Sequence, residues 1–293
     1  PAEYMPRRFY RMGAVRECQS PAQIRRTVRR LARVGVSAIK TAVVSRTFDG
    51  KPVRGWSDAQ LNALTDEAHR HGLMVCAHLT YAADYVQAAR CGVDSVHHAA
   101  FDGVITDRVA DELIEAGVVF VPTLSLASLL IDGMQYRWCD DPQFTAGLPP
   151  ALVRNMREFT THYEQCPPDE PVPGFFVSLP KREWEAVPEN QLRNVAKYIE
   201  RGGTIALGTD SALGFSLHGT PVREMELMVE AGLNTVEAIQ AAGQNAARVF
   251  SHKENIGTIT PGALADCLLV PAEITASMTH LADISTVIQG GKV

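Results

Sequence analysis

A repeated unit, one amphipathic helix followed by one short apolar strand, constrains the fold of this chain more than any other feature. The first unit puts Ile24, Val28 and Leu31 on one helical face and continues through Gly35 into the apolar segment "VSAIK". Four further units end in "LMVCAH", "CGVDSVHH", "AGVVFVPT" and "TIALGTD". This alternation predicts a parallel sheet with helices outside it, either doubly wound or a (β/α)8 barrel.

Residues 123–188 interrupt the rhythm, and their Pro, Trp and Asp content favours a long insertion with some helix, such as a lid over the strand ends. The rhythm resumes with an expected helix at 189–201, and two more helices are expected at about 219–232 and 235–250. The tail predicts short strands joined by Pro-Gly and Gly-Gly turns. We therefore expect one domain over 1–252 and a second, small one over 253–293.

The net charge and the cysteines narrow the possible partners and compartment. A net charge of -5 over 293 residues gives no reason to expect a nucleic acid or an anionic membrane as partner. The sequence contains no apolar run of the length that spans a bilayer. The six cysteines are scattered without a C-x-x-C pair, which favours a reducing, cytoplasmic location.

Polar side chains stand at the carboxyl ends of four of the expected strands. They are Lys40, His78, the pair His97 and His98, and Asp210. In parallel sheets and barrels these ends meet at one edge, where ligands bind. Each group is costly to bury without a partner, and a divalent metal would satisfy them together. Taken singly, Lys40 is typical of a surface lysine and Asp210 of a helix N-cap.

The segments "SAIK", "VCAH", "GVDSVHH" and "IALGTD", in this order and spacing, resemble the amidohydrolase superfamily. The nearest likeness is to its imidazolonepropionase and prolidase-like branch, and the tail "NIGTITPGALADCLLV" resembles the end of the same family. The resemblance implies an α/β fold, a (β/α)8 TIM-type barrel with a small C-terminal β-sandwich. The five strands of this chain would match the fourth to eighth strands of that barrel.

The resemblance also implies a role for each polar residue. Lys40 would be carboxylated and would bridge two divalent metal ions, with zinc as the expected metal. His78 and His98 would be ligands, while Asp210 would bind metal and take a proton from the attacking water. His97 stands where the family has Glu, so it either competes as a ligand or supports one. Because adjacent strand residues face opposite sides, we expect only one of the two histidines to point at the barrel axis.

The family's first three strands, with their His-x-His motif, have no counterpart in this sequence. We expect either a missing N-terminal segment or a second chain to complete the barrel, because three absent strands would leave two open edges. A homo-oligomer is also expected.

The predicted function is metal-dependent hydrolysis of a C–N bond in a small amide, peptide-like or cyclic amide substrate. The same centre also suits ester, lactone or organophosphate hydrolysis, and without His-x-His the chain would be an inactive remnant or a non-catalytic subunit. Three residues are weak candidates for substrate contact, His97 among them. Tyr81 follows His78 closely enough to reach a substrate, although packing on the barrel rim suits an aromatic ring there better, and His218 either touches substrate or caps a helix.

Overall fold

A computed structural model of the chain describes residues 10–12, 15–46, 51–173, 179–211, 215–219, 221–250 and 255–293. Its centre is a parallel sheet of five strands whose order in space is their order along the chain. The strands are β1 (Ala38–Ala42), β2 (Met74–His78), β3 (Ser95–His97), β4 (Val119–Val121) and β5 (Thr204–Ile205). The predicted parallel sheet is therefore confirmed, whereas closure into a barrel stays a prediction.

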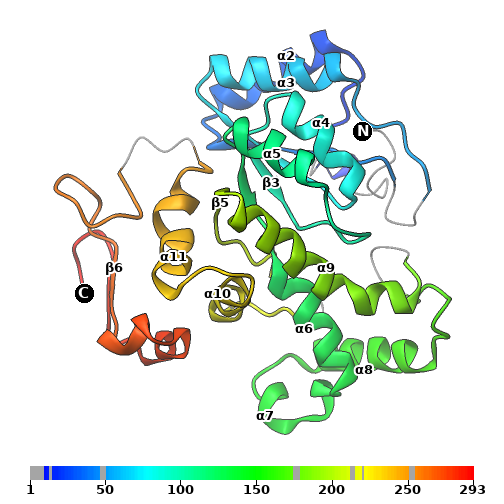
Figure 1. Cartoon of the computed structure of the whole chain (residues 1–293), viewed down its shortest axis with the longest axis vertical. Helices are drawn as coiled ribbons and strands as arrows, with labels where there is room; N and C mark the ends of the chain where they lie inside the picture. Colours follow the sequence, from blue (N-terminus) through cyan, green and yellow to red (C-terminus); the bar gives the residue numbers. More distant parts are fainter. Residues whose placement is uncertain are drawn as a thin grey trace.

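Four helices alternate with the first four strands along the chain and lie on one face of this sheet (Figure 1). They are α2 (Pro21–Arg33), α3 (Asp58–Arg70), α4 (Tyr85–Arg90) and α5 (Asp107–Glu115). Local sequence fixes where they start, since Ser20 caps α2 and Ser57 forms a capping box with Gln60 at α3.

The main core lies between the sheet and these helices. Every second residue of each strand faces the helices, so the strands contribute a layer of buried apolar side chains. On the strand side this layer contains Ile39, Val75, Val96, Phe120 and Ile205. On the helix side it contains Ile24, Val28, Leu61, Tyr85 and Leu113, and Tyr198 joins the same core from a later helix, Lys181–Glu200.

The opposite face of the sheet, here called the inner face, carries the polar candidates. The register pairs Lys40 with Cys76, His78 with His97, and His97 with Val121. Residues paired across strands lie on the same side of a sheet, and residues two apart on one strand also share a side. Lys40, His78 and His97 therefore all belong to the inner face.

The predicted insertion is mostly helical. It contains α6 (Leu124–Gln135), α7 (Pro142–Thr145), α8 (Pro150–Gln165) and the start of α9 (Lys181–Glu200). Helix α9 begins eight residues before the expected position 189 and continues through Pro188. Proline is unfavourable in a helix interior, but the fully buried Trp184 and Val187 anchor the early turns of α9. Tertiary packing thus overrides the local signal.

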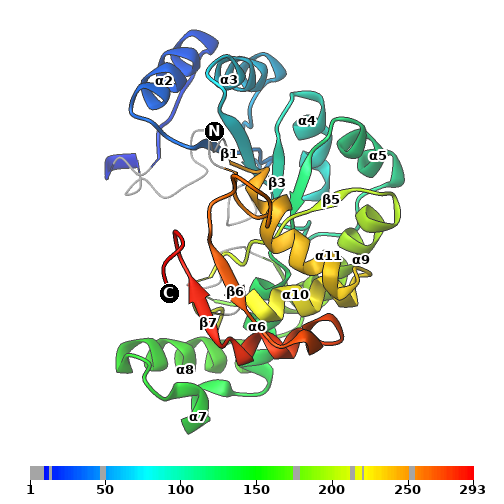
Figure 2. The same ribbon diagram turned by 90° about the vertical axis from the view of Figure 1, so that its left-hand side faces the viewer.

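These helices build a second hydrophobic core of their own. Trp184, Met134 and Met156 lie at its centre with almost no exposed surface. Helices α7 and α8 stand away from the sheet, at the lower end of the molecule in both views (Figures 1 and 2).

After β5 the chain forms α10 (Pro221–Glu230) and α11 (Thr235–Gln240), followed by one turn of π-helix over Ala241–Asn245. The tail contains an antiparallel pair, β6 (Cys267–Leu269) and β7 (Thr286–Ile288). The expected short strands are present, while a complete β-sandwich stays a prediction. The expected domain boundary after residue 252 falls at 251–254, outside the described residues. Among the described helices, none has the length and apolar character needed to cross a membrane.

Candidate functional site

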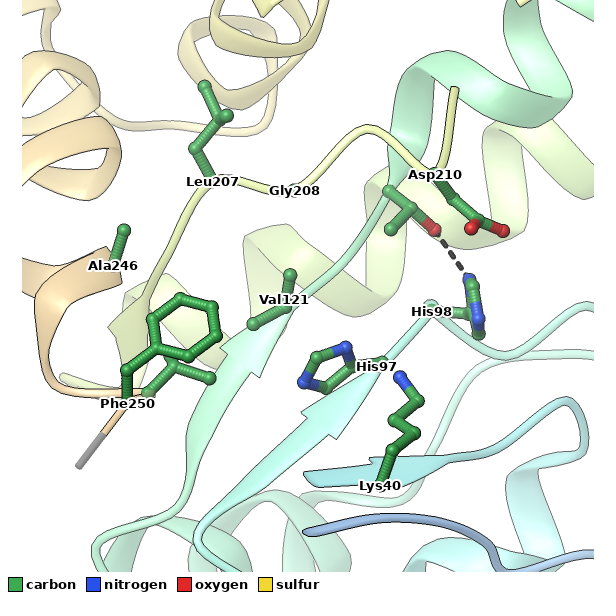
Figure 3. Close-up of a pocket in the computed structure, with 11 residues that line it drawn as sticks. Lys40, His97, His98, Val121, Leu207, Gly208, Asp210, Ala246 and Phe250 are labelled. Carbon is green, nitrogen blue, oxygen red and sulfur yellow. Dashed lines mark hydrogen bonds between the residues drawn. The ribbon is translucent and has the colours of Figure 1, made fainter. Parts of the chain in front are cut away.

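A cavity of about 180 Å³ opens at the carboxyl ends of the strands. Five of its lining residues are polar, namely Lys40, His97, His98, Thr123 and Asp210. Its other walls are apolar and come from Val121, Leu207, Gly208, Ala246, Val249 and Phe250. Figure 3 shows the Lys40 amine, both imidazoles and the Asp210 carboxylate directed toward one region. The convergence expected from the strand ends is thus seen for these four residues.

Lys40 projects from the middle of β1 on the inner face. Its side chain as a whole is exposed, yet the protein around its amine lowers the pKa to about 8 by desolvation, against the opposing influence of Cys76 and Asp210. An amine with this pKa is partly neutral near pH 7, whereas an ordinary lysine is fully charged. Carboxylation by CO₂ requires the neutral amine, so the environment of Lys40 suits that modification.

His78 and His98 lie against each other, with ring centroids 4.5 Å apart. Burial, followed by the charge of Lys40, lowers the pKa of His78 to about 3. Burial likewise holds the pKa of His98 well below its usual range. Both rings are therefore neutral at pH 7, the form in which imidazole nitrogens bind metals.

His98 reaches this position through an unusual backbone conformation. Strand β3 ends at His97, and His98 has φ of 70°, in the left-handed region. Its carbonyl accepts a hydrogen bond of 2.5 Å from the Tyr85 hydroxyl, and its Nδ1 lies 2.8 Å from Thr123 Oγ1. The left-handed turn swings the His98 ring back toward the cavity.

The expectation that only one of the adjacent histidines points at the site is therefore wrong. It assumed that the strand continues through both residues, but the strand stops one residue earlier. His97 stays on the inner face, with its Nε2 3.0 Å from Ser95 Oγ, and both rings line the cavity. Burial lowers the pKa of His97 to about 3 as well.

Asp210 follows β5 and also adopts a left-handed conformation, with φ of 49°. Burial raises the pKa of its carboxyl group, and the positive charge of Lys40 opposes this rise. The two groups therefore interact electrostatically across the cavity. Residues 212–214, which follow, lie outside the described residues.

Tyr81 and His218, two of the weak candidates for substrate contact, do not line this cavity, whereas the third, His97, does. Tyr81 is 6% exposed and packs with the Arg46 guanidinium 5.8 Å from the centre of its ring. His218 is exposed. Of residues 123–188, only Thr123 contributes to the described cavity wall, so a lid function for the insertion stays a prediction, as do roles for Tyr81 and His218.

Sequence reasoning missed Thr123, Tyr85 and Glu224. Thr123 was detectable by the rule that identified the other residues, because it follows the apolar strand "VVFVP" at its carboxyl end. Glu224 is fully buried on α10 and hydrogen-bonds the start of α6. Its signal was an acidic residue on the apolar face of an amphipathic helix.

The donor set fits a metal ion only if Lys40 takes part. Within the described residues, no three His, Cys, Asp or Glu side chains are grouped so as to hold a metal. The pair His78 and His98 would supply nitrogen donors, and Asp210, which lines the cavity with His98, would supply oxygen. A carbamate on Lys40 would add oxygen donors beside them, and this combination of donors suits a divalent ion such as zinc.

Comparison with known proteins gives a family match over almost the whole chain. The model described as "Amidohydrolase family" matches residues 3–293. Ochratoxinase from Aspergillus niger is 27% identical over 232 residues, covering 76% of this chain and 38% of that protein. The chain thus spans well under half the length of this curated relative.

Solved structures share the fold. A Xaa-Pro dipeptidase with methionine bound in the active site aligns with a TM-score of 0.67 and 23% identity, over 94% of this chain and 58% of that one. The A. niger ochratoxinase structure aligns with a TM-score of 0.67 and 22% identity, over 94% of this chain and 54% of that one. These likenesses show a shared fold, and both the prolidase-like and the imidazolonepropionase parts of the predicted resemblance stay predictions.

Proposed function

Because this chain belongs to the amidohydrolase family, we propose that it acts as a metal-dependent hydrolase of carbon–nitrogen bonds. The proposal rests mainly on one observation, the pair of neutral imidazoles, His78 and His98, beside a lysine with a lowered pKa at the carboxyl edge of a parallel sheet. Solvated surface histidines would keep ordinary pKa values, and a purely structural pair would not need a lysine amine close enough to lower the pKa of both rings.

The proposed ligands are His78, His98, Asp210 and Lys40, the last as its carbamate. When bound there, divalent metal ions would polarise the scissile carbonyl and lower the pKa of a water molecule. His97 would help to shape the inner wall beside Lys40, as a neutral ring held by Ser95.

Asp210 is the proposed general base and acid. Its carboxylate would accept a proton from the attacking water and deliver it to the departing amine nitrogen. A raised pKa suits this exchange, because it brings the basicity of the carboxylate nearer to the working pH. The apolar walls from Val121, Leu207 and Phe250 would limit bulk water around the reacting atoms.

For the substrate, we propose a small amide or peptide-like molecule. The relatives support this choice through what their names state, an ochratoxinase and a Xaa-Pro dipeptidase. Binding of the substrate would use the cavity at the strand ends, with completion of the active site by the remaining part of the protein or by a second chain.

The test combines metal analysis with a substrate panel. The purified protein should contain divalent metal and hydrolyse Xaa-Pro dipeptides or N-acyl amino acids, and Asp210→Asn should lose turnover even when metal is supplied in excess. Glu230→Gln, on the exposed side of α10, is the matched control. Hydrolysis confined to esters, lactones or organophosphates would contradict the choice of substrate. Absence of both metal and turnover would favour an inactive chain or a non-catalytic subunit.

A further inference from the structure

Glu224 is a carboxyl group with no exposed surface in the interior of the protein. It lies on α10, and its two oxygens reach the first turn of α6, 99 to 100 residues earlier in the chain. One oxygen accepts a hydrogen bond of 2.8 Å from the Leu124 backbone N–H, and the other accepts one of 2.6 Å from that of Ser125. Glu224 therefore supplies the acceptors that the open N-terminus of α6 lacks.

The residue that normally provides such a cap is the one just before the helix. This residue is Thr123, and its side chain makes no capping hydrogen bond. It has φ of 54° and ψ of 44°, a left-handed conformation that β-branched residues rarely adopt. A threonine at this position ordinarily has an extended backbone and caps its own helix with its hydroxyl.

The Thr123 hydroxyl is used elsewhere. Its Oγ1 lies 2.8 Å from Nδ1 of His98, and both residues are buried. A proton on Nδ1 that is donated to Oγ1 leaves the lone pair of the other ring nitrogen, Nε2, free for a metal ion. Thr123 is thus placed to fix both the orientation and the tautomer of His98.

From these contacts we infer that Glu224 is a positioning residue for the metal centre: it caps α6 in place of Thr123 and so releases the Thr123 hydroxyl to hold His98. This inference rests on the proposed function, since it assigns His98 as a ligand. Loss of the Glu224 cap would let Thr123 return to an extended, self-capping conformation. The hydroxyl would then turn away from His98.

Zinc affinity provides the first test. Competition with a chromophoric chelator at pH 8 should show that Glu224→Gln weakens zinc binding by about 10- to 100-fold, the usual effect of losing a group that orients a ligand. Glutamine has one acceptor oxygen, so its amide N–H₂ would face one of the two backbone N–H groups. Glu230→Gln, an exposed change on the same helix, should leave the affinity unchanged.

The link through Thr123 requires a double-mutant cycle. Thr123→Val should weaken zinc binding to a similar degree, and adding Glu224→Gln to it should cause little further loss, because both changes break one chain of contacts. Additive losses would overturn the inference. So would an unchanged zinc affinity in a folded Glu224→Gln protein.

Thr123→Gly keeps the test decisive if Glu224→Gln does not fold. Glycine accepts the left-handed conformation without strain but lacks the hydroxyl, so this variant should fold well and still bind zinc about 10-fold more weakly. Wild-type affinity in Thr123→Gly would overturn the inference.

The metal-free protein separates this inference from the proposed function. Imidazole ¹⁵N NMR should show one His98 tautomer, protonated at Nδ1, in the wild type and a mixture of tautomers in Glu224→Gln. This result combined with no zinc binding by the wild type would contradict the proposed function while supporting the link from Glu224 to His98. Identical tautomer signals in both proteins would overturn the link itself.

Discussion

The imidazole of His98 lies edge-on to that of His78, with the ring planes inclined by 71°. His78 is the last residue of β2, whereas His98 follows the end of β3, and the left-handed turn at His98 brings the two rings together. The neutral state of both rings follows from their burial. This pair is the part of the candidate site that a metal-binding experiment probes most directly.

His98→Ala should lose bound metal, whereas His97→Ala should keep most of it. The His98 ring contacts His78 and is oriented by Thr123, while the His97 ring is held by Ser95 on the inner face. The metal content of the two purified variants, measured by inductively coupled plasma mass spectrometry, shows which histidine holds the metal. Because the two changes remove the same side chain from neighbouring positions, each is the control for the other. Loss of metal in His97→Ala alone would exchange their roles.

Lys40→Ala should reduce hydrolysis by about 100-fold or more, because it removes the proposed bridging carbamate. Short carboxylic acids added to this variant should restore part of the rate by placing an oxygen ligand in the same position. The measurement is the initial rate with and without added acid, with Lys292→Ala, an exposed lysine, as control. Retention of most of the activity without rescue would remove the carbamate from the mechanism.

The buried Glu224 should make stability fall as the pH rises through neutrality. Burial raises the pKa of Glu224 to about 7 in the folded protein, above the ordinary value of 4.5 for this side chain. Between these values the folded chain keeps a proton that the unfolded chain releases, so this contribution is complete below pH 4.5 and is lost above about pH 7. The largest change attributable to Glu224 across this window is about 3 kcal/mol.

Urea unfolding of the wild type and of Glu224→Gln at pH 5, 6, 7 and 8 tests this sign. The variant does not titrate at this position, so its stability relative to the wild type should increase as the pH rises. Other buried groups, including the histidines, titrate in both proteins and largely cancel in the difference. A constant difference across the four pH values would contradict the raised pKa.

Gly133→Ala should destabilise the protein by about 1–3 kcal/mol through overpacking. A Cβ at Gly133 on α6 would lie 2.3 Å from Cγ of Phe215, in the segment that follows β5. Urea unfolding measures the loss, and adding Phe215→Leu should restore part of it, because the smaller side chain makes room. If the double variant lost as much stability as the two single variants together, these residues would not press on each other.

The sheet was predictable because its signals are local. Each strand is an apolar run, Ser20, Ser57 and Thr106 cap three of the first four helices, and strand ends in a parallel sheet share one edge. This reasoning placed Lys40, His97, His98 and Asp210 around one cavity. It also identified His78, which lies against His98.

Other features depended on contacts between distant parts of the chain. The left-handed turn at His98 relies on Tyr85 and Thr123, and the early start of α9 relies on the insertion core around Trp184. The cap supplied by Glu224 spans about a hundred residues of sequence. No periodic pattern or turn signal records such contacts, so helical spacing and strand alternation alone do not predict them.

The two separate hydrophobic cores have a consequence for protein engineering. The insertion surrounds its own centre, Trp184 and Met156, and meets the rest of the molecule through a few apolar side chains such as Phe101 and Phe215. Sequence changes within α7 and α8 therefore leave the layer between sheet and outer helices intact. We expect this segment to tolerate exchange, as a unit, for another helical segment with an apolar core of its own, provided that the first turn of α6 and these two phenylalanines are preserved.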